Sequence, residues 1–491
     1  MPEEPKNPLA GEEQSLTSGD KPLADEEQSL AGTEQPLPGA AKSLVAEEKS
    51  LIAEEKSLVG EEYEVEIGPV AHGGHCIART EAGQVLFVRH TLPGERVIAR
   101  VTEGEEGARF LRADAVRILQ PSKDRVEAPC PFSGPGRCGG CDWQHAKPGA
   151  QRRLKGEVVA EQLMRLAGLT PEAAGWDGTV EPAPGDKVGP GEVPAWRTRV
   201  QYAVDAEGRA GLRKHRSHDV EPITHCLIAA PGVSELGVEQ RDWPQIATVE
   251  AIAATGSHDR QVILTPRPGG RLPIVELDKP VSVMRVGEKD KGVHRVHGRP
   301  FVRERAAGRT WRVGNGGFWQ VHPKAADLLV DAVMQGLMPK KGDMALDLYC
   351  GVGLFAGALA ERVGDKGAVL GIESGKRAVE DARHNLADLD RVRIEHGKVE
   401  SILPRTGITD VDLVVLDPPR AGAGKSTVHH LASLTPRRLA YVACDPAALA
   451  RDLKYFAEVG YAPRRMRAFD LFPMTHHVEC VVVLERADKG R

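Results

Sequence analysis

The C-terminal third of the chain alternates short apolar runs with longer amphipathic stretches. Apolar runs lie at residues 343–347, 368–373 and 411–416, and stretches with helical periodicity lie at 354–363 and 376–389. Strand-length apolar runs that alternate with helix-length segments are typical of strand–helix units around a parallel sheet. The pattern therefore predicts an α/β fold over residues 305–491, built on a doubly wound parallel sheet.

In residues 63–121, apolar and polar residues alternate over short runs. Alternating runs at 63–67, 84–88 and 96–101 are separated by Gly-Gly and Pro-Gly turns, which predicts a small OB-like β-barrel. Such a barrel either binds single-stranded nucleic acid or serves as a plain structural module.

Residues 122–304 have a mixed pattern, which indicates an α+β central domain. Residues 197–204 and 211–218 read as a basic hairpin, whereas the Gly- and Pro-rich residues 174–194 read as a loop.

Residues 1–62 consist almost entirely of a short sequence repeat. Residues 7–62 form eight seven-residue repeats, each with a Leu at its third place. A coiled coil needs two apolar positions spaced three and four apart, and here the second apolar residue is absent or adjacent to the Leu. Prolines also interrupt the first five repeats, so we expect a disordered acidic tail.

Charge separates this tail from the rest of the chain. The 491 residues have a formal net charge of −5, but residues 1–62 hold 13 Glu, 2 Asp and 5 Lys, a net of −10. The remaining residues therefore carry +5, which suits a polyanionic partner. An apolar run of membrane-spanning length and a secretory signal are both absent from the sequence, which predicts a cytoplasmic protein with reduced cysteines and no membrane partner.

A glycine-rich motif follows the first apolar run of the α/β region. Asp347 begins the pattern Asp-x-x-x-Gly-x-Gly, in which Gly351 and Gly353 let the backbone approach a ligand at a helix N-terminus. Glu373 ends the next predicted strand, where a carboxylate can bind ribose hydroxyls. Dinucleotide and S-adenosylmethionine folds share this signal. Ala356 stands where the nicotinamide pattern has a third glycine, and a later Asp-Pro-Pro turn favours a methyltransferase.

Two further residues supply candidate chemistry. Cys444 follows an apolar strand and precedes Asp-Pro, and Glu479 precedes the last strand. A thiolate that adds to carbon 6 of a uracil makes carbon 5 nucleophilic toward a sulfonium methyl, and a base then removes the carbon 5 proton. The pair therefore suits methylation of a pyrimidine carbon, although a buried inert Cys and a surface Glu are the alternatives.

These residues resemble the RNA uracil-C5-methyltransferase family, over roughly residues 63–491. The run Phe318 to Pro323 resembles the family's Phe-x-Gln-x-Asn motif, and the segments at Cys444 and Glu479 resemble its Ser-Cys-Asn-Pro and His-Val-Glu motifs. The resemblance implies a Rossmann-like class I methyltransferase domain, a TRAM barrel at 63–121, Cys444 as nucleophile and Glu479 as proton acceptor. By the same match, the residues that bind S-adenosylmethionine are Gln320, Tyr349, Gly351, Gly353, Glu373 and Asp417.

Three positions depart from the family pattern. His322 and Asp445 stand where the family has Asn, and Leu354 stands where it has Asn after the second glycine. Asp445 is anionic and adjoins the nucleophile, so we expect it to raise the pKa of the thiol.

Four cysteines form a candidate metal site, namely Cys130, Cys138, Cys141 and Cys226. Their spacing suits zinc or an iron–sulfur cluster. The ribosomal-RNA subgroup of the family carries a [4Fe-4S] cluster in a similar pattern, so the resemblance implies such a cluster.

The resulting prediction is a monomeric enzyme that methylates carbon 5 of a uridine in 23S rRNA. Three alternatives stay open: a tRNA uridine methyltransferase, an amino-group methyltransferase, and a catalytically idle RNA-binding or chaperone protein. The second is disfavoured because Arg420 stands where that class has an aromatic residue after the prolines.

Overall fold

The computed structural model describes residues 56–186, 189, 192–275, 277 and 279–487. Contacts group Glu55–Arg491 into one compact unit. The predicted acidic tail lies almost wholly outside the described residues. None of the helices in the described part of the chain has the length and apolar character that crossing a membrane requires.

The first module is a closed barrel, as its alternating pattern predicted. Its five strands within residues 56–186 are ordered β1-β2-β3-β5-β4. Inward-facing aliphatic residues such as Val65, Leu86 and Val97 are buried together in its interior. The strands are β1 (Glu62–Val70), β2 (Cys76–Arg79), β3 (Val85–Arg89), β4 (Arg96–Glu103) and β5 (Leu111–Gln120).

The central region forms a sheet with the order β13-β12-β11-β10-β7-β8-β9 and a separate hairpin, β14-β15. The predicted basic hairpin is present as β7 and β8. Residues 282–300, where the sequence pattern shows no clear strand, form β12 and β13; the edge strand β13 is mostly exposed, whereas β12 buries Val283 and Met284. The strands are β7 (Arg199–Val204), β8 (Ala210–Arg213), β9 (Val220–Pro222), β10 (Ile246–Ala253), β11 (Arg260–Pro266), β12 (Ser282–Val286), β13 (Val293–His297), β14 (Phe301–Ala306) and β15 (Arg309–Gly314).

The C-terminal sheet has the order β18-β17-β16-β19-β20-β22-β21-β6 among the described strands. The first five run parallel, and β22 is antiparallel to both β20 and β21. The strands are β16 (Met344–Leu348), β17 (Ala368–Glu373), β18 (Val392–His396), β19 (Leu413–Leu416), β20 (Arg438–Ala443), β21 (Tyr461–Asp470), β22 (Glu479–Arg486) and β6 (Val180–Pro182).

Both faces of this sheet are buried. Leu346 and Leu348 pack into one apolar core, while their neighbour Ala345 packs into the other, as the alternation of strand side chains requires. The helices are α2 (Pro148–Gln162), α3 (Pro231–Ser234), α4 (Ala325–Leu337), α5 (Leu354–Val363), α6 (Lys376–Asn385), α7 (Val399–Ile402), α8 (Gly424–Ser433) and α9 (Pro446–Glu458). Residues of α4, α5 and α6 belong to the second core, and residues of α2, α8 and α9 belong to the first.

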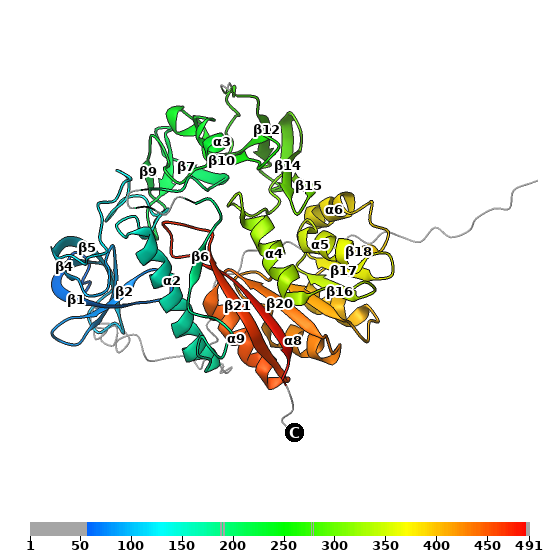
Figure 1. Ribbon diagram of the computed structural model, residues 1–491. Coiled ribbons are helices and arrows are strands. Elements are labelled where there is room, and N and C mark those ends of the chain that lie inside the picture. The colour runs from blue at the N-terminus through cyan, green and yellow to red at the C-terminus, as the bar shows by residue number, and fades with distance from the viewer. Residues whose placement is uncertain (1–55, 187–188, 190–191, 276, 278, 488–491) are drawn as a thin grey trace, which may run out of the picture. The chain divides into compact units, whose positions relative to one another are not determined.

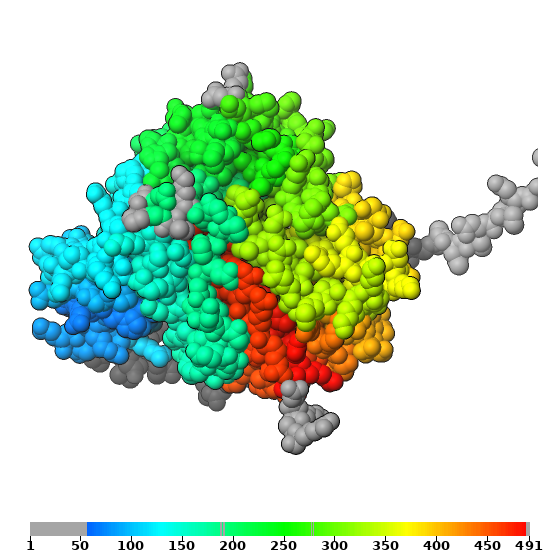
Figure 2. Space-filling view, viewed as in Figure 1, coloured from blue at the N-terminus to red at the C-terminus, as the bar shows by residue number. Residues whose placement is uncertain are grey.

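Strand β6 comes from residues that the sequence predicted to be a loop. It pairs in parallel with β21, and the preceding helix α2 packs beside it (Figure 1). The space-filling view shows this segment lying along the C-terminal strands at the surface (Figure 2). The chain therefore joins the central region to the C-terminal sheet through a shared edge strand.

Candidate active site

The glycine-rich loop connects β16 to α5. Tyr349 has a φ of 64°, a conformation that is uncommon for a residue with a side chain. Gly353, with a φ of 93°, is the N-cap of α5, and a Cβ atom there would lie 2.7 Å from Leu386. The loop therefore turns sharply and leads into the N-terminus of α5.

Two carboxylates hold this loop. Asp347 is fully buried and accepts a hydrogen bond from the Ala356 amide (2.7 Å) through Oδ2. Glu373 accepts hydrogen bonds from the amides of Gly351 (3.0 Å) and Gly375 (2.6 Å). Glu373 therefore lies against the glycine loop, where the sequence predicted a ligand for ribose hydroxyls.

One carboxylate oxygen beside the glycine loop has no protein partner. The Oδ1 atom of Asp347 is buried without a hydrogen bond to any described residue. Burial, together with the nearby Asp417 and Glu373, raises the pKa of Asp347 well above its ordinary value. A ligand with an ammonium or sulfonium charge fits such a group, because it supplies the missing counter-charge.

Gln320 lies in the connection between β15 and α4. Its neighbour Trp319 packs on an apolar cluster that includes Val352 of the glycine loop. Nearby, His322 is buried and its Nε2 lies 3.1 Å from an Asp186 oxygen. The His322 imidazole therefore takes part in a packed, hydrogen-bonded support, and Trp319 packs this segment against the cluster that contains Val352.

The candidate nucleophile and base face each other across two paired strands. Ala443, the last residue of β20, pairs with Cys480 of β22. Cys444 and Glu479 are the residues next to this pair, and they lie close enough for the Glu479 charge to act on the Cys444 thiol. Asp417 follows β19, which is the neighbour of β20 on its other side. The sheet therefore gathers Cys444, Glu479 and Asp417 at one edge.

These three groups share an environment that disfavours negative charge. Burial, followed by the charges of Glu479 and Asp417, raises the pKa of Cys444 to about 11. Burial raises the pKa of Asp417 to about 7, and burial with the Asp417 charge raises that of Glu479 well above its usual range. A nearby cation, such as Arg420 or a bound sulfonium, opposes this effect and favours the ionised forms.

Asp445 has a defined role beside the nucleophile. It is the N-cap of α9, and its Oδ1 accepts a hydrogen bond from the Ala448 amide (2.8 Å). Its charge contributes to the raised pKa of Cys444, as expected, but is a smaller cause than burial or Glu479. Its Oδ2 lies 3.1 Å from Nε2 of His72 in the barrel, a residue that the sequence patterns did not single out.

The segment before Glu479 is anchored by the central region. Asp142 accepts hydrogen bonds from both the amide (3.0 Å) and Nδ1 (2.7 Å) of His476. Lys155 of α2 is fully buried and lies 2.5 Å from Asp470 at the end of β21. No local motif identifies Asp142 or Lys155, because their partners are more than 300 residues away in the chain.

A polar cleft of about 460 Å³ adjoins this segment. Aromatic residues Trp196 and Phe472 line it together with His476 and His477. Its cationic lining residues are Arg197, Arg213 and Arg420. Arginines and stackable rings in one cleft suit a phosphodiester chain with unstacked bases.

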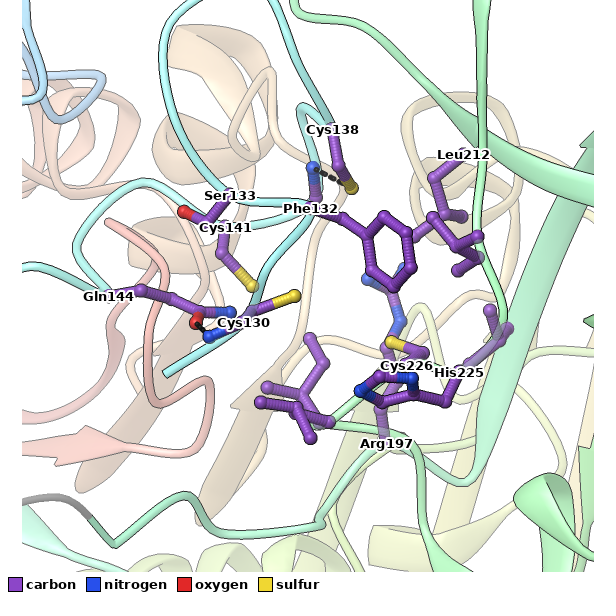
Figure 3. Close-up of a pocket in the computed structure, with 15 residues that line it drawn as sticks. Cys130, Phe132, Ser133, Cys138, Cys141, Gln144, Arg197, Leu212, His225 and Cys226 are labelled. Atoms are coloured by element: carbon purple, nitrogen blue, oxygen red, sulfur yellow. Dashed lines mark hydrogen bonds between the residues drawn. The ribbon is translucent and has the colours of Figure 1, made fainter. Parts of the chain in front are cut away.

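The four predicted metal-ligating cysteines line one small pocket (Figure 3). Cys130, Cys138 and Cys141 come from one loop, and Cys226 comes from the segment after β9. The cavity between them is only about 20 Å³, and no group of three or more His, Cys, Asp or Glu side chains in the described residues is arranged to hold a metal ion. The donor chemistry therefore suits a metal, but the arrangement of the side chains does not support the predicted site.

Comparison with known proteins adds to this geometry. Residues 56–116 match the TRAM domain, and residues 406–487 match tRNA (Uracil-5-)-methyltransferase. Residues 321–401 match Protein-L-isoaspartate(D-aspartate) O-methyltransferase, which covers the glycine-loop region.

A solved structure has the same fold over most of the chain. It is the tRNA (uracil-54, C5)-methyltransferase of Pyrococcus abyssi in complex with S-adenosyl-L-homocysteine, with a TM-score of 0.64 and 23% identity. The match covers 86% of this chain and 99% of that one. The likeness confirms that the chain has a methyltransferase fold.

Closer relatives are found by sequence. An uncharacterized RNA methyltransferase of Streptomyces coelicolor is 83% identical over 428 residues, which are 87% of this chain and 93% of the relative. Another, from Corynebacterium efficiens, is 33% identical over 86% of this chain and 94% of the relative. With a TRAM barrel, a methyltransferase fold and relatives of this identity along most of its length, the chain belongs to the RNA methyltransferase family.

Proposed function

We propose that this protein transfers a methyl group from S-adenosylmethionine to carbon 5 of a uridine in RNA. The observation that carries the proposal is that paired strands bring Cys444, Glu479 and Asp417 together, so that the charges of Glu479 and Asp417 act on the Cys444 thiol. The match of residues 406–487 to tRNA (Uracil-5-)-methyltransferase supports it, because this segment contains all three residues.

The proposed reaction uses the two facing side chains in sequence. The Cys444 thiolate forms a bond to carbon 6 of the uracil, which places electron density on carbon 5. S-adenosylmethionine would supply an electrophilic methyl group: carbon 5 bonds to this methyl as its bond to the sulfonium sulfur breaks, and the sulfur leaves as the neutral thioether S-adenosylhomocysteine. The Glu479 carboxylate then accepts the carbon 5 proton, and the carbon–sulfur bond breaks to restore the ring and the thiolate. The raised pKa of Glu479 makes its ionised form a strong base for this step.

The cofactor is proposed to lie along the carboxyl ends of β16, β17 and β19. The unpartnered Asp347 oxygen and the neighbouring carboxyl of Asp417 favour a cationic ligand there. The glycine loop leaves room for its close approach, since a Cβ atom at Gly351 would meet nothing within 4 Å. The proposed binding residues are Gln320, Tyr349, Gly351, Gly353, Glu373 and Asp417.

The proposed RNA substrate is 23S rRNA, with tRNA as the alternative. The resemblance of the barrel and the cysteine pattern to the ribosomal-RNA subgroup supports the first, and the description of the matching family supports the second. In either case the target base must leave its helix to reach Cys444, and the cleft lined by arginines and aromatic rings suits the flanking nucleotides.

We also propose that the four clustered cysteines bind a [4Fe-4S] cluster with a structural role. All four are free of disulfides and line one pocket. Binding requires the Phe132 ring, which lines the same pocket, to make room while the four sulfur atoms stay directed at the cluster.

RNA that contains 5-fluorouridine tests the proposed reaction. Fluorine at carbon 5 cannot leave as a proton, so the enzyme should remain bonded to the RNA through Cys444 after methyl transfer. We expect an adduct on denaturing gels with wild-type enzyme and S-adenosylmethionine, and none with Cys444→Ala. Cys480→Ala is the matched control, because Cys480 lies beside the site but is fully buried, and it should keep the adduct.

The same experiment distinguishes the alternatives. Parallel reactions with 23S rRNA and with tRNA transcripts should give the adduct with the ribosomal RNA. An adduct with tRNA alone would replace the proposed substrate. A wild-type enzyme that forms no adduct with either RNA would contradict carbon 5 methylation and favour an idle RNA-binding protein.

A further inference from the structure

The turn between β1 and β2 of the barrel reaches the residue next to the nucleophile. Nε2 of His72, in this turn, lies 3.1 Å from Oδ2 of Asp445. A carboxylate offers only acceptors, so the imidazole must donate through Nε2. Since the other oxygen of Asp445 accepts the Ala448 amide, both ends of this carboxylate are engaged.

The position of His72 is fixed from several sides. Gly73 and Gly74 both have positive φ, which makes the turn tight, and the carbonyl of Gly74 accepts a hydrogen bond from the Trp143 indole (3.0 Å). A Cβ atom at Gly74 would lie 2.8 Å from His476, so the turn packs directly on the segment that precedes Glu479. The turn that carries the exposed His72 side chain is therefore held over the catalytic edge of the sheet.

We propose that His72 is a positioning residue for the nucleophile: by donating to Asp445, it orients that carboxylate and offsets its charge beside Cys444. The inference rests on the proposed role of Cys444. The contact accounts for an Asp next to the nucleophile of this chain, because the barrel supplies that carboxylate with a hydrogen-bond donor. The barrel then contributes to catalysis through Asp445, in addition to any contact with RNA.

The charges around Cys444 and Asp445 decide whether loss of His72 raises or lowers the thiolate fraction of Cys444. Glu479, Asp417 and Asp445 all favour the neutral thiol of Cys444, and Arg420 opposes them. Facing Asp445 are His72 and the amides of Ala447 and Ala448, which lower its pKa against the effect of burial. Loss of His72 leaves the Asp445 charge less compensated, so the thiolate of Cys444 becomes less populated.

Alkylation of Cys444 by iodoacetamide tests the proposal without RNA or cofactor. The rate, followed on the Cys444 peptide by mass spectrometry between pH 7 and 10, reports the thiolate fraction. We expect His72→Ala to slow alkylation by about threefold, as for loss of one hydrogen bond that partly offsets the neighbouring carboxylate charge. Asp445→Asn keeps a good N-cap residue and should speed the reaction, and His72→Ala should then have no further effect.

A matched histidine provides the control. His294 also pairs with an Asp at the protein surface, at 2.7 Å from Asp290, but on β13 of the central sheet. His294→Ala should leave the alkylation profile unchanged. The proposal is overturned if His72→Ala has no effect in the wild type, or if it slows alkylation equally with Asp445 and with Asn at that position. Because the assay needs no methyl transfer, failure of the proposed function would appear separately, as a missing RNA adduct.

Discussion

At the scale of single residues, the chemistry of the site depends on what surrounds each group. Asp417, Glu479 and Cys444 are ordinary acids in water, and burial raises the pKa of all three in the folded chain. The sequence predicted their identities from short motifs. It did not predict their protonation, because that depends on neighbours from different strands.

The pKa of Asp417 leads to a prediction for cofactor binding. At about 7, this pKa leaves the carboxyl neutral in mild acid and ionised above neutrality. A cationic ligand binds the ionised form better, so the affinity for S-adenosylmethionine should rise between pH 6 and 8. Asp417→Asn should weaken binding by roughly tenfold at pH 8, within the range for loss of a charged partner, and should flatten the profile. Isothermal titration calorimetry measures both effects.

A second aspartate serves as the control for this prediction. Asp343 lies just before β16, at the end of the sheet away from the glycine loop, and pairs with Arg437 at 2.8 Å. Asp343→Asn should keep the pH dependence of the wild type. If Asp417→Asn kept it as well, the cationic part of the cofactor would not lie near Asp417.

At the scale of elements, helix α2 and strand β6 join a sheet whose other strands begin more than 150 residues later in the chain. Lys155 of α2 and Asp470 of β21 form a buried ion pair, and Lys155 also donates to the carbonyl of Phe472 (3.0 Å). The pair fixes the start of the segment that leads to Glu479. Hydrophobic periodicity did not predict it, since a lysine on a helix normally indicates the solvent-facing side.

Breaking this pair should destabilise the protein. Lys155→Met leaves the Asp470 carboxylate buried without its partner, which typically costs about 3–5 kcal/mol. We expect urea unfolding, followed by tryptophan fluorescence, to show a loss of this size. Arg165→Met is the matched control, because Arg165 and Glu161 form an exposed pair worth under about 1 kcal/mol. Similar losses for both variants would show that burial of Lys155 does not matter.

At the scale of the whole molecule, three distant parts of the chain meet at the catalytic edge. The barrel contributes His72, the cysteine loop contributes Asp142, and the C-terminal strands contribute Cys444 and Glu479. The amides of Asp142 and Trp143 both donate to the carbonyl of Met474, at 2.9 and 3.0 Å. The loop that holds three of the clustered cysteines is thus bonded directly to the segment before the base.

The proposed cluster gives a prediction at this scale. Protein purified without oxygen should contain about four irons and four sulfides per chain and absorb broadly in visible light. Cys226→Ser should reduce the iron content and lower the melting temperature, because Cys226 joins the loop to a different part of the central region. Cys76→Ser, at a buried barrel cysteine, should retain the iron. A colourless protein loaded with zinc would contradict the cluster.

The sequence alone indicated the features that depend on residues close together along the chain. Alternation predicted the barrel and the α/β region, and fixed spacing identified the glycine loop, Cys444 and Glu479, since each is encoded within about ten residues. It gave no signal for β6 and β12, or for the pairings of His72 with Asp445, Asp142 with His476 and Lys155 with Asp470. These were decided by tertiary structure, because each joins residues that only the packing of separate modules brings into contact.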